Sequence, residues 1–351
     1  MRLFSPRGRH LVGVDVCATS VKMVAIERQH GIFHLKSYGI ASLAPGIVVD
    51  KVIVDVEAVS MVIAALARRC QVSGRDAATA VAGSSVITKI IDMDMLLTDV
   101  EREAQIRLDA EQYIPYPLDE VNLDFEVLGP SLLDENLVQV LLAASRSENV
   151  ELRVDALALG GFKTKIMDID SHAIERAFGL MVDNLSNLPE LVALVDIGHT
   201  QTTLYVAKDG NFVYSREQLF GGIQLTEAIQ DRYGLSFEEA SVNKREHTLP
   251  DDYYPEILIP FMENAIQQIT RSLQFYFSSS PYDSIDHVVL AGGSSSIPGL
   301  AGMVQQKLQV PVTVANPFIN MTIDPYINNE QLAIDAPSLM AACGLALRSF
   351  D

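Results

Sequence analysis

Two aspartates occupy matching places in two similar segments of the chain. Asp15 follows the apolar run Val12–Val14, and Asp196 follows Leu194–Val195; a turn of small and hydroxyl residues and a second apolar run come after each. Backbone N–H and hydroxyl groups in such a turn can bind phosphate, and an aspartate beside them can hold a hydrated Mg²⁺. We therefore predict a phosphate and magnesium site, with Asp15 and Asp196 approaching the metal through water from opposite walls of a cleft.

The phosphate ligands predicted from the two turns are Ala18, Thr19 and Ser20 in the first, and Gly198, His199, Thr200 and Thr202 in the second. Lys22 could add a point charge, and its alternative is a strand residue that faces solvent. No nucleophile motif or carboxylate accompanies His199, so we expect only its backbone N–H to take part.

Glycines mark two further segments that could approach a ligand. The buried run Val288–Ala291 leads into Gly292, Gly293 and Ser294, and Gly222 opens a predicted helix. Without a Cβ, backbone at such places can lie against a base or a phosphate. The predicted binding residues therefore include these four.

Composition excludes several classes of protein. The formal net charge of −19 argues against nucleic acid and anionic lipid as direct partners, since no basic stripe is present. GxxxxGK[ST] and GxGxxG motifs are both missing, which excludes a P-loop enzyme and a dinucleotide loop. The three cysteines form no CxxC pair and fit a reducing compartment. Apolar runs such as Leu339–Leu347 are far shorter than the roughly 20 residues that span a bilayer, so we expect a cytoplasmic protein without membrane insertion.

The elements that must position these residues alternate between strands and helices. Apolar runs predict strands at 11–16, 21–28, 33–40, 77–82 and 165–169. They predict helices at 56–70, 173–184 and 237–244, and three further helices that begin at Gly222, after Pro260 and at Ser338. Asp55 is the predicted N-cap of the helix over 56–70.

Residues 84–162, called the insert below, have a pattern of their own. We predict a strand at 86–93, a helix opened by a Thr98/Glu101 capping box, strands at 121–128 and 137–144, and a helix at 147–159. Val100, Ala104 and Leu108 share one face of the first helix. The order predicts a self-sufficient α+β unit.

The two aspartate turns and the glycine segment, in this order, resemble the phosphate 1, phosphate 2 and adenosine motifs of the actin, sugar kinase and Hsp70 superfamily. That resemblance implies an α/β, actin-like, two-domain ATPase fold built from two ribonuclease H-like halves. It makes Asp170 the general-base candidate, with a helix N-cap as its other reading. It also places Glu239 and Lys244 at the base-side wall, where Ser241 replaces the glutamate that binds ribose in several relatives and leaves Lys244 as the predicted contact.

Longer motifs resemble the PilM family of cytoplasmic type IV pilus assembly proteins. They are Asp109–Leu118, Leu141–Val150, Arg216–Gly222, Arg271–Phe277, Val289–Gly293 and Ala342–Asp351. The resemblance implies an FtsA-like layout: residues 1–83, 163–187 and 328–351 as subdomain 1A, 84–162 as inserted subdomain 1C, 188–235 and 285–327 as subdomain 2A, and 236–284 as subdomain 2B.

The same resemblance implies ATP with Mg²⁺ in the cleft and a docking site for the N-terminal cytoplasmic tail of the membrane protein PilN. Through PilN the chain would be linked to PilO, PilP and the pilus motor ATPases, and recruited to the cytoplasmic face of the inner membrane. The predicted function is an ATP-binding adaptor in pilus biogenesis and twitching motility, with at most slow ATPase activity. The alternative is an ATPase with significant turnover or a small-molecule kinase.

Overall fold

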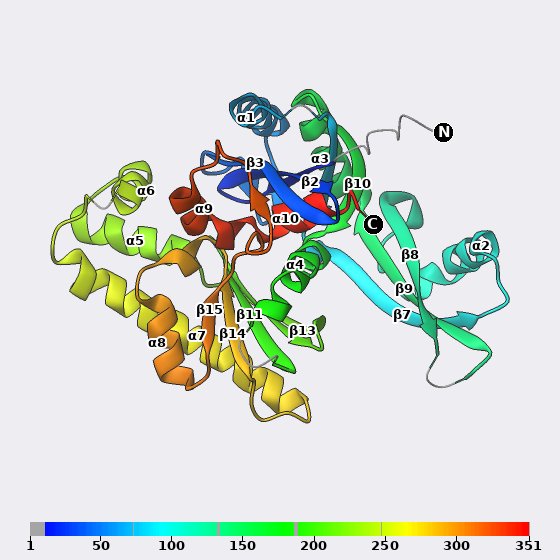
Figure 1. The fold of residues 1–351 in the computed structure, drawn as a ribbon. Coiled ribbons are helices and arrows are strands. Elements are labelled where there is room, and N and C mark those ends of the chain that lie inside the picture. Colours follow the sequence, from blue (N-terminus) through cyan, green and yellow to red (C-terminus); the bar gives the residue numbers. More distant parts are fainter. Residues whose placement is uncertain (1–10, 73, 132–133, 186–188, 247, 351) are drawn as a thin grey trace. The chain divides into compact units, whose positions relative to one another are not determined.

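The computed structural model describes residues 11–350, apart from 73, 132–133, 186–188 and 247. The described chain divides into two compact units (Figure 1). Unit 1 contains residues up to Met23, Tyr38–Ala173 and the C-terminal residues from Arg348. Unit 2 contains Val24–Ser37 and Ile174–Leu347, so the division passes through two strands of one sheet.

That sheet has six strands in the order β10-β6-β1-β2-β3-β16. The strands are β1 (Val12–Val16), β2 (Ser20–Gln29), β3 (Ile32–Ser42), β6 (Asp76–Val81), β10 (Lys163–Ile169) and β16 (Thr322–Ile323). Within unit 1, β1 and β10 both run parallel to β6. The register sets Val12 opposite Ala77, so the predicted first strand lies inside the sheet, as its apolar run requires.

Helices α1 (Val56–Arg69) and α3 (Ser147–Leu159) share the core of unit 1. Asp55 caps α1 as predicted, because its carboxylate accepts the Ala58 N–H at 2.9 Å. Ile63 of α1 and Leu157 of α3 are fully buried in one cluster with β1. Although α3 belongs to the insert in sequence, its buried face is part of the core of unit 1.

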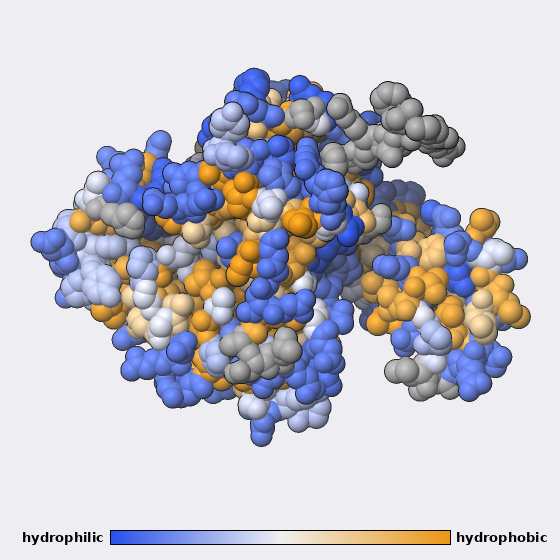
Figure 2. Space-filling model, in the orientation of Figure 1, coloured by the Kyte–Doolittle hydropathy of each residue, from blue (hydrophilic) through white to orange (hydrophobic). Residues whose placement is uncertain are grey.

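The remainder of the insert forms an antiparallel sheet in the order β7-β9-β8, with one helix. Its elements are β7 (Val86–Asp94), α2 (Asp99–Asp109), β8 (Val121–Pro130) and β9 (Leu137–Arg146). The predicted Thr98/Glu101 capping box opens α2. Arg102 and Ile106 turn inward, whereas Val100 and Leu108 are 78% and 81% exposed. The predicted shared face of α2 therefore carries apolar side chains on the surface of the insert, where Figure 2 shows orange atoms.

Unit 2 is built on a five-stranded sheet in the order β13-β12-β11-β14-β15. Its strands are β11 (Leu191–Ile197), β12 (Thr202–Lys208), β13 (Asn211–Gln218), β14 (His287–Ala291) and β15 (Val312–Val314). β14 runs parallel to β11, and β12 returns antiparallel. The second aspartate turn therefore lies at the carboxyl end of β11, next to the carboxyl end of β14.

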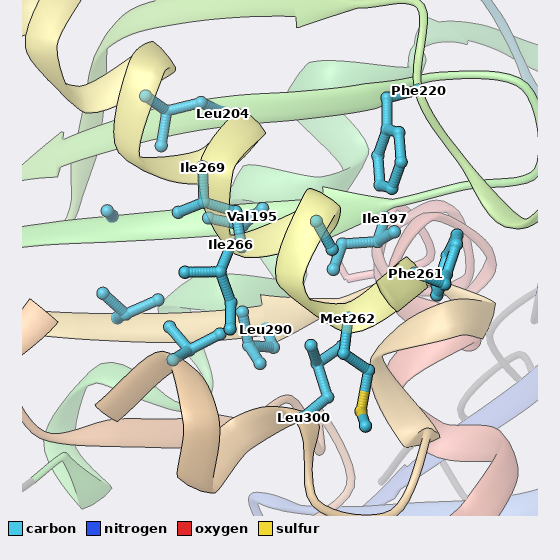
Figure 3. Close-up of a cluster of buried hydrophobic side chains, with 14 of the residues drawn as sticks. Val195, Ile197, Leu204, Phe220, Phe261, Met262, Ile266, Ile269, Leu290 and Leu300 are labelled. Atoms are coloured by element: carbon cyan, nitrogen blue, oxygen red, sulfur yellow. The ribbon is translucent and has the colours of Figure 1, made fainter. Parts of the chain in front are cut away.

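The long helix α7 (Ile259–Ser279) covers this sheet. Figure 3 shows Ile266 and Ile269 of α7 against Val195 and Leu290 of the strands. The other helices that contribute to unit 2 are α4 (Asp170–Gly179), α5 (Gly222–Tyr233), α6 (Phe237–Glu246), α8 (Leu300–Leu308), α9 (Asn329–Asp335) and α10 (Met340–Leu347). At the edge strand β13, the Phe212 N–H donates to the Glu175 carboxylate of α4. Among the described residues, no helix has the length and apolarity needed to cross a bilayer.

Candidate functional site

The first aspartate turn joins β1 to β2 in unit 1. The Cys17 N–H donates to the Ser20 carbonyl at 2.9 Å, and the Thr19 carbonyl accepts the Leu43 N–H at 2.8 Å. The Lys22 ammonium lies 3.2 Å from Asp15 Oδ2, and only 15% of each side chain is exposed. Lys22 therefore points to the turn, and not into solvent as its alternative reading had it.

A cysteine lies beside this ion pair. The Cys17 thiol donates to Asp15 Oδ2 at 3.0 Å and accepts from the Lys22 ammonium at 3.1 Å. Burial, with Asp15 second, raises the pKa of Cys17 to about 12, so the thiol is protonated at neutral pH. Cys17 was not among the predicted site residues, although it stands inside the turn.

Asp170 begins α4 and is also in unit 1. Its Oδ1 accepts the Gly83 N–H at 2.7 Å, which fixes the residue just before the insert. Burial raises the pKa of Asp170, while Lys51 and the Gly83 hydrogen bond act in the opposite direction. The carboxylate thus anchors a turn of the chain, and its predicted role as general base stays a prediction.

The second aspartate turn, in unit 2, is tied to the start of α5. The Gly222 N–H donates to the Gly198 carbonyl at 2.9 Å, and the Ile223 N–H donates to the His199 carbonyl at 2.8 Å. A Cβ on Gly221 would lie 2.6 Å from the Gly198 carbonyl oxygen. Backbone therefore approaches backbone so closely here that only glycine fits.

The predicted glycine segment meets the same turn. Gly292 has φ 84° and ψ 165°, and a Cβ there would overlap the carboxylate of Asp196 and the carbonyl of Ile197. A Cβ on Gly222 would lie 2.8 Å from Ser294 Oγ. The structure thus brings together the Asp196 turn, the start of α5 and the Gly292–Ser294 segment, as the sequence predicts, in a small, tightly packed cradle in which Gly221, Gly222 and Gly292 are buried and Gly293 is exposed.

Lys244 lies beside this cradle. Its ammonium donates to Thr226 Oγ1 at 2.6 Å and to the Gly222 carbonyl at 3.5 Å. Burial, with Arg245 second, lowers the pKa of Lys244 to about 8. Burial and the charge of Lys244 also lower the pKa of His199, which is therefore neutral at pH 7.

Several predicted residues have other partners. The Thr202 hydroxyl is buried and donates to the Phe220 carbonyl at 2.7 Å, whereas Thr200 is exposed at the turn. Glu239 accepts the Ser236 N–H at 2.8 Å and so helps to cap α6. Thr200 is therefore better placed than Thr202 to offer its hydroxyl to a ligand.

These residues fit a nucleotide with its metal. At the cradle, the exposed Thr200 and Gly293 and the cation of Lys244 are groups that suit phosphate and ribose oxygens. In the described part of the chain, no three His, Cys, Asp or Glu side chains are grouped as a metal site. Mg²⁺ commonly takes only one or two carboxylates when phosphate oxygens and water supply the remaining ligands. The one aspartate of the cradle, Asp196, is compatible with that coordination.

Comparisons with known proteins show which proteins this chain is similar to. A solved structure described as the PilM-PilN type IV pilus biogenesis complex is 27% identical, has a TM-score of 0.81 and matches over 99% of this chain and 100% of that one. The ethanolamine utilization protein EutJ from Carboxydothermus hydrogenoformans has a TM-score of 0.57 at 18% identity, covering 96% of this chain and 89% of that one. EutJ of Escherichia coli (strain K12) is 27% identical over 148 residues, 40% of this chain and 49% of that protein, so the chain spans about half the length of this curated relative.

The fold prediction is confirmed: the chain has the actin-like fold of these structural neighbours. The family model described as "Type IV pilus assembly protein PilM" matches residues 13–350. The chain belongs to the family of the type IV pilus assembly protein PilM.

Proposed function

We propose that this chain is an ATP-binding adaptor of the type IV pilus machine that docks the cytoplasmic tail of PilN. The observation that carries the adaptor role is the match along the whole chain with a protein solved in complex with PilN. Through PilN the chain would be held at the cytoplasmic face of the inner membrane and linked to PilO, PilP and the pilus motor ATPases.

The cradle of unit 2 supports the nucleotide part of the proposal. The Asp196 turn, the start of α5 and the Gly292 segment pack directly against one another, with no room for a Cβ at Gly221, Gly222 or Gly292, and Lys244 adds a partly buried cation. In this proposal the cradle binds the nucleotide together with Gly293, Ser294 and the first turn, from Ala18 to Ser20 with Lys22. Asp15 and Asp196 would hold Mg²⁺ through water.

Slow turnover is also part of the proposal. Fast phosphoryl transfer needs a positioned base and several groups that stabilise the developing charge. The one candidate base, Asp170, already accepts a hydrogen bond from Gly83. We therefore expect the chain to bind ATP and to hydrolyse it slowly at most, as suits an adaptor better than a kinase.

The nucleotide proposal is tested by calorimetry of Mg-ATP with Asp196→Ala and a matched control, Asp231→Ala. Asp231 is an exposed acid on α5 of the same unit. We expect Asp196→Ala to lose most of the Mg-dependent affinity, while Asp231→Ala binds like the parent. An unchanged affinity in Asp196→Ala would show that the metal and nucleotide bind elsewhere.

The partner proposal places the PilN tail in a groove beside the insert, where β7 and β8 are the edge strands of the described sheet. An extended peptide can add to such an edge through main-chain hydrogen bonds. Ordering a flexible tail lowers affinity, so we expect a dissociation constant in the micromolar range, about 1 μM or weaker.

A deletion tests this placement without damaging the core of unit 1. Removal of residues 86–145 keeps α3, whose Ala156 and Leu157 are buried against α1. Because Val86 pairs with Ser145, the cut ends are neighbours and a Gly-Ser link can join them. A deletion variant that folds should still bind nucleotide, and it should no longer bind a synthetic peptide of the PilN tail. Retention of the peptide would move the docking site away from the insert.

A further inference from the structure

A groove lies between the outer faces of α7 and α8 in unit 2. The two helices are neighbours (Figure 1), and Ile266 of α7 is buried in one cluster with Leu300 and Val304 of α8. The groove has a volume of about 810 Å³, within the usual range of ligand sites. Its lining residues belong to 263–274 and 303–307, so the nucleotide site proposed above does not use it.

The length of the groove follows from α7. Its side of the groove is formed by residues at steps of three or four, which share one face of the helix. They include Glu263, Gln267, Arg271 and Gln274. From Glu263 to Gln274 the helix rises about 16 Å, which is the length of about five residues of extended chain. The groove can therefore hold a short extended peptide along its whole length.

The walls of the groove are polar and its floor is apolar. The exposed amides of Gln267, Gln274 and Gln306 each offer donors and an acceptor, the same groups that a peptide main chain offers. In the described part of the chain, these three amides have no hydrogen-bond partner. At the floor, Ile266 is 7% exposed and Met303 of α8 is half-buried. A helix would set its apolar ridge against polar walls here, so the lining favours an extended peptide.

Each wall of the groove also carries a cation. Arg271 of α7 and Lys307 of α8 are exposed, and neither makes an ion pair or a side-chain hydrogen bond with another residue that the structure describes. Glu263 is the one acid among the described lining residues. The groove therefore has a positive balance in a chain whose formal net charge is −19. Two unpaired cations in such surroundings attract an acidic ligand and repel a basic one.

We propose that the groove between α7 and α8 binds an acidic segment of a partner protein in extended conformation. The main chain of the segment bonds to the glutamine amides, and alternate side chains reach the apolar floor. An Asp or Glu side chain of the segment pairs with Arg271 or Lys307. The chain then has a docking site besides the one proposed for the PilN tail, and this site does not depend on bound nucleotide.

The test selects peptides from a random seven-residue library displayed on phage. Phage that bind Arg271→Gln/Lys307→Gln are removed first, and the remainder is selected on the parent protein. We expect the recovered sequences to be enriched in Asp and Glu. The best of them, synthesised with a fluorescent label, should bind the parent at about 1–100 μM and the double variant at least about tenfold more weakly.

Two further variants separate the groove from general effects of charge and folding. Lys163→Gln/Lys165→Gln removes two exposed lysines of β10 in unit 1 and has the same net charge as the groove variant. It should bind the peptide within about twofold of the parent. Glu263→Gln removes the acid of the groove and should bind the peptide about two- to fivefold more tightly, which damage to the fold would not produce.

Recovery of no peptide after the subtraction, or of peptides without acidic enrichment, would overturn the proposal. An equal loss of affinity in the β10 variant would overturn it too, because the effect would then be one of net charge. Citrate that displaces the labelled peptide as effectively as unlabelled peptide does would show a site for small anions, and a peptide would not be its occupant.

Discussion

Gly292 allows the packing of the cradle in unit 2 to be tested against a matched control. Its φ of 84° and ψ of 165° lie in a region that is almost exclusive to glycine, and residues forced into it cost about 1–3 kcal/mol. An added Cβ would also lie 2.6 Å from the Ile197 carbonyl carbon, and such overpacking costs about 1–3 kcal/mol. Taking the middle of both ranges, we expect Gly292→Ala to lower the free energy of unfolding by about 4 kcal/mol.

Gly210 serves to separate the cost of the backbone conformation from the cost of the close contact. It has nearly the same φ, 83°, and no atom lies within 4 Å of a Cβ placed on it. Gly210→Ala, in the same unit, should lower the free energy of unfolding by only about 1–2 kcal/mol. Urea unfolding followed by circular dichroism suits a chain without tryptophan, and the Gly292→Ala midpoint should fall by about 1 M. Equal losses in the two variants would refute the claim that backbone, Asp196 and Gly292 are packed too closely for a methyl group.

Three further predictions concern single residues. The parent protein should release phosphate from ATP more slowly than about 1 per second, a rate typical of kinases; a faster rate that Asp170→Ala abolishes would support an enzyme instead. In α2, Ile106→Ala should lower the free energy of unfolding by about 2–4 kcal/mol because Ile106 is 1% exposed. Leu108→Ala should lower it by less than about 0.5 kcal/mol. Similar losses for the two variants in urea unfolding would contradict the burial of Ile106 on the inward face of α2. The pKa of Lys244 in the folded protein, about 8, lies below its ordinary value of 10.5. Between about pH 8 and pH 10.5 the unfolded state therefore binds more protons than the folded state, and the free energy of unfolding rises with pH over this range. Lys244→Met should therefore be more stable than the parent at pH 7, by up to about 3 kcal/mol, and thermal unfolding should show this advantage shrinking towards pH 10.

Local signals in the sequence predicted much of the fold. The Asp55 cap, the Thr98/Glu101 capping box and the bounds of α3 agree with the structure. Each depends on residues within a few positions of one another, which is why the sequence alone carries them. The three glycine-rich and aspartate-rich segments are equally local, and the structure joins two of them in unit 2.

Other features gave no recognisable signal in the sequence and were not predicted. The loop after Pro45 contains the hairpin of β4 (Val48–Val49) and β5 (Val52–Ile53), whose Asp50–Lys51 turn lacks the usual Asn-Gly signal. Arg153 meets Lys51 from a helix far along the chain. The inward face of α2 carries a buried arginine, Arg102, whose guanidinium donates to Asp99 and to the Leu97 carbonyl. A pattern of apolar spacing cannot find a core position filled by a charged side chain.

The hydrogen bond between Glu175 and Phe212 has a consequence for behaviour at high concentration. An edge strand offers unpaired N–H and C=O groups on which a strand of another molecule can assemble. At β13 the first such N–H is already occupied by a carboxylate from the same chain. A neighbouring molecule that added a strand there would have to displace Glu175, and it would carry the same net charge of −19. Strand-by-strand aggregation along β13 is thus opposed both by a local competitor for the strand's N–H group and by long-range charge repulsion.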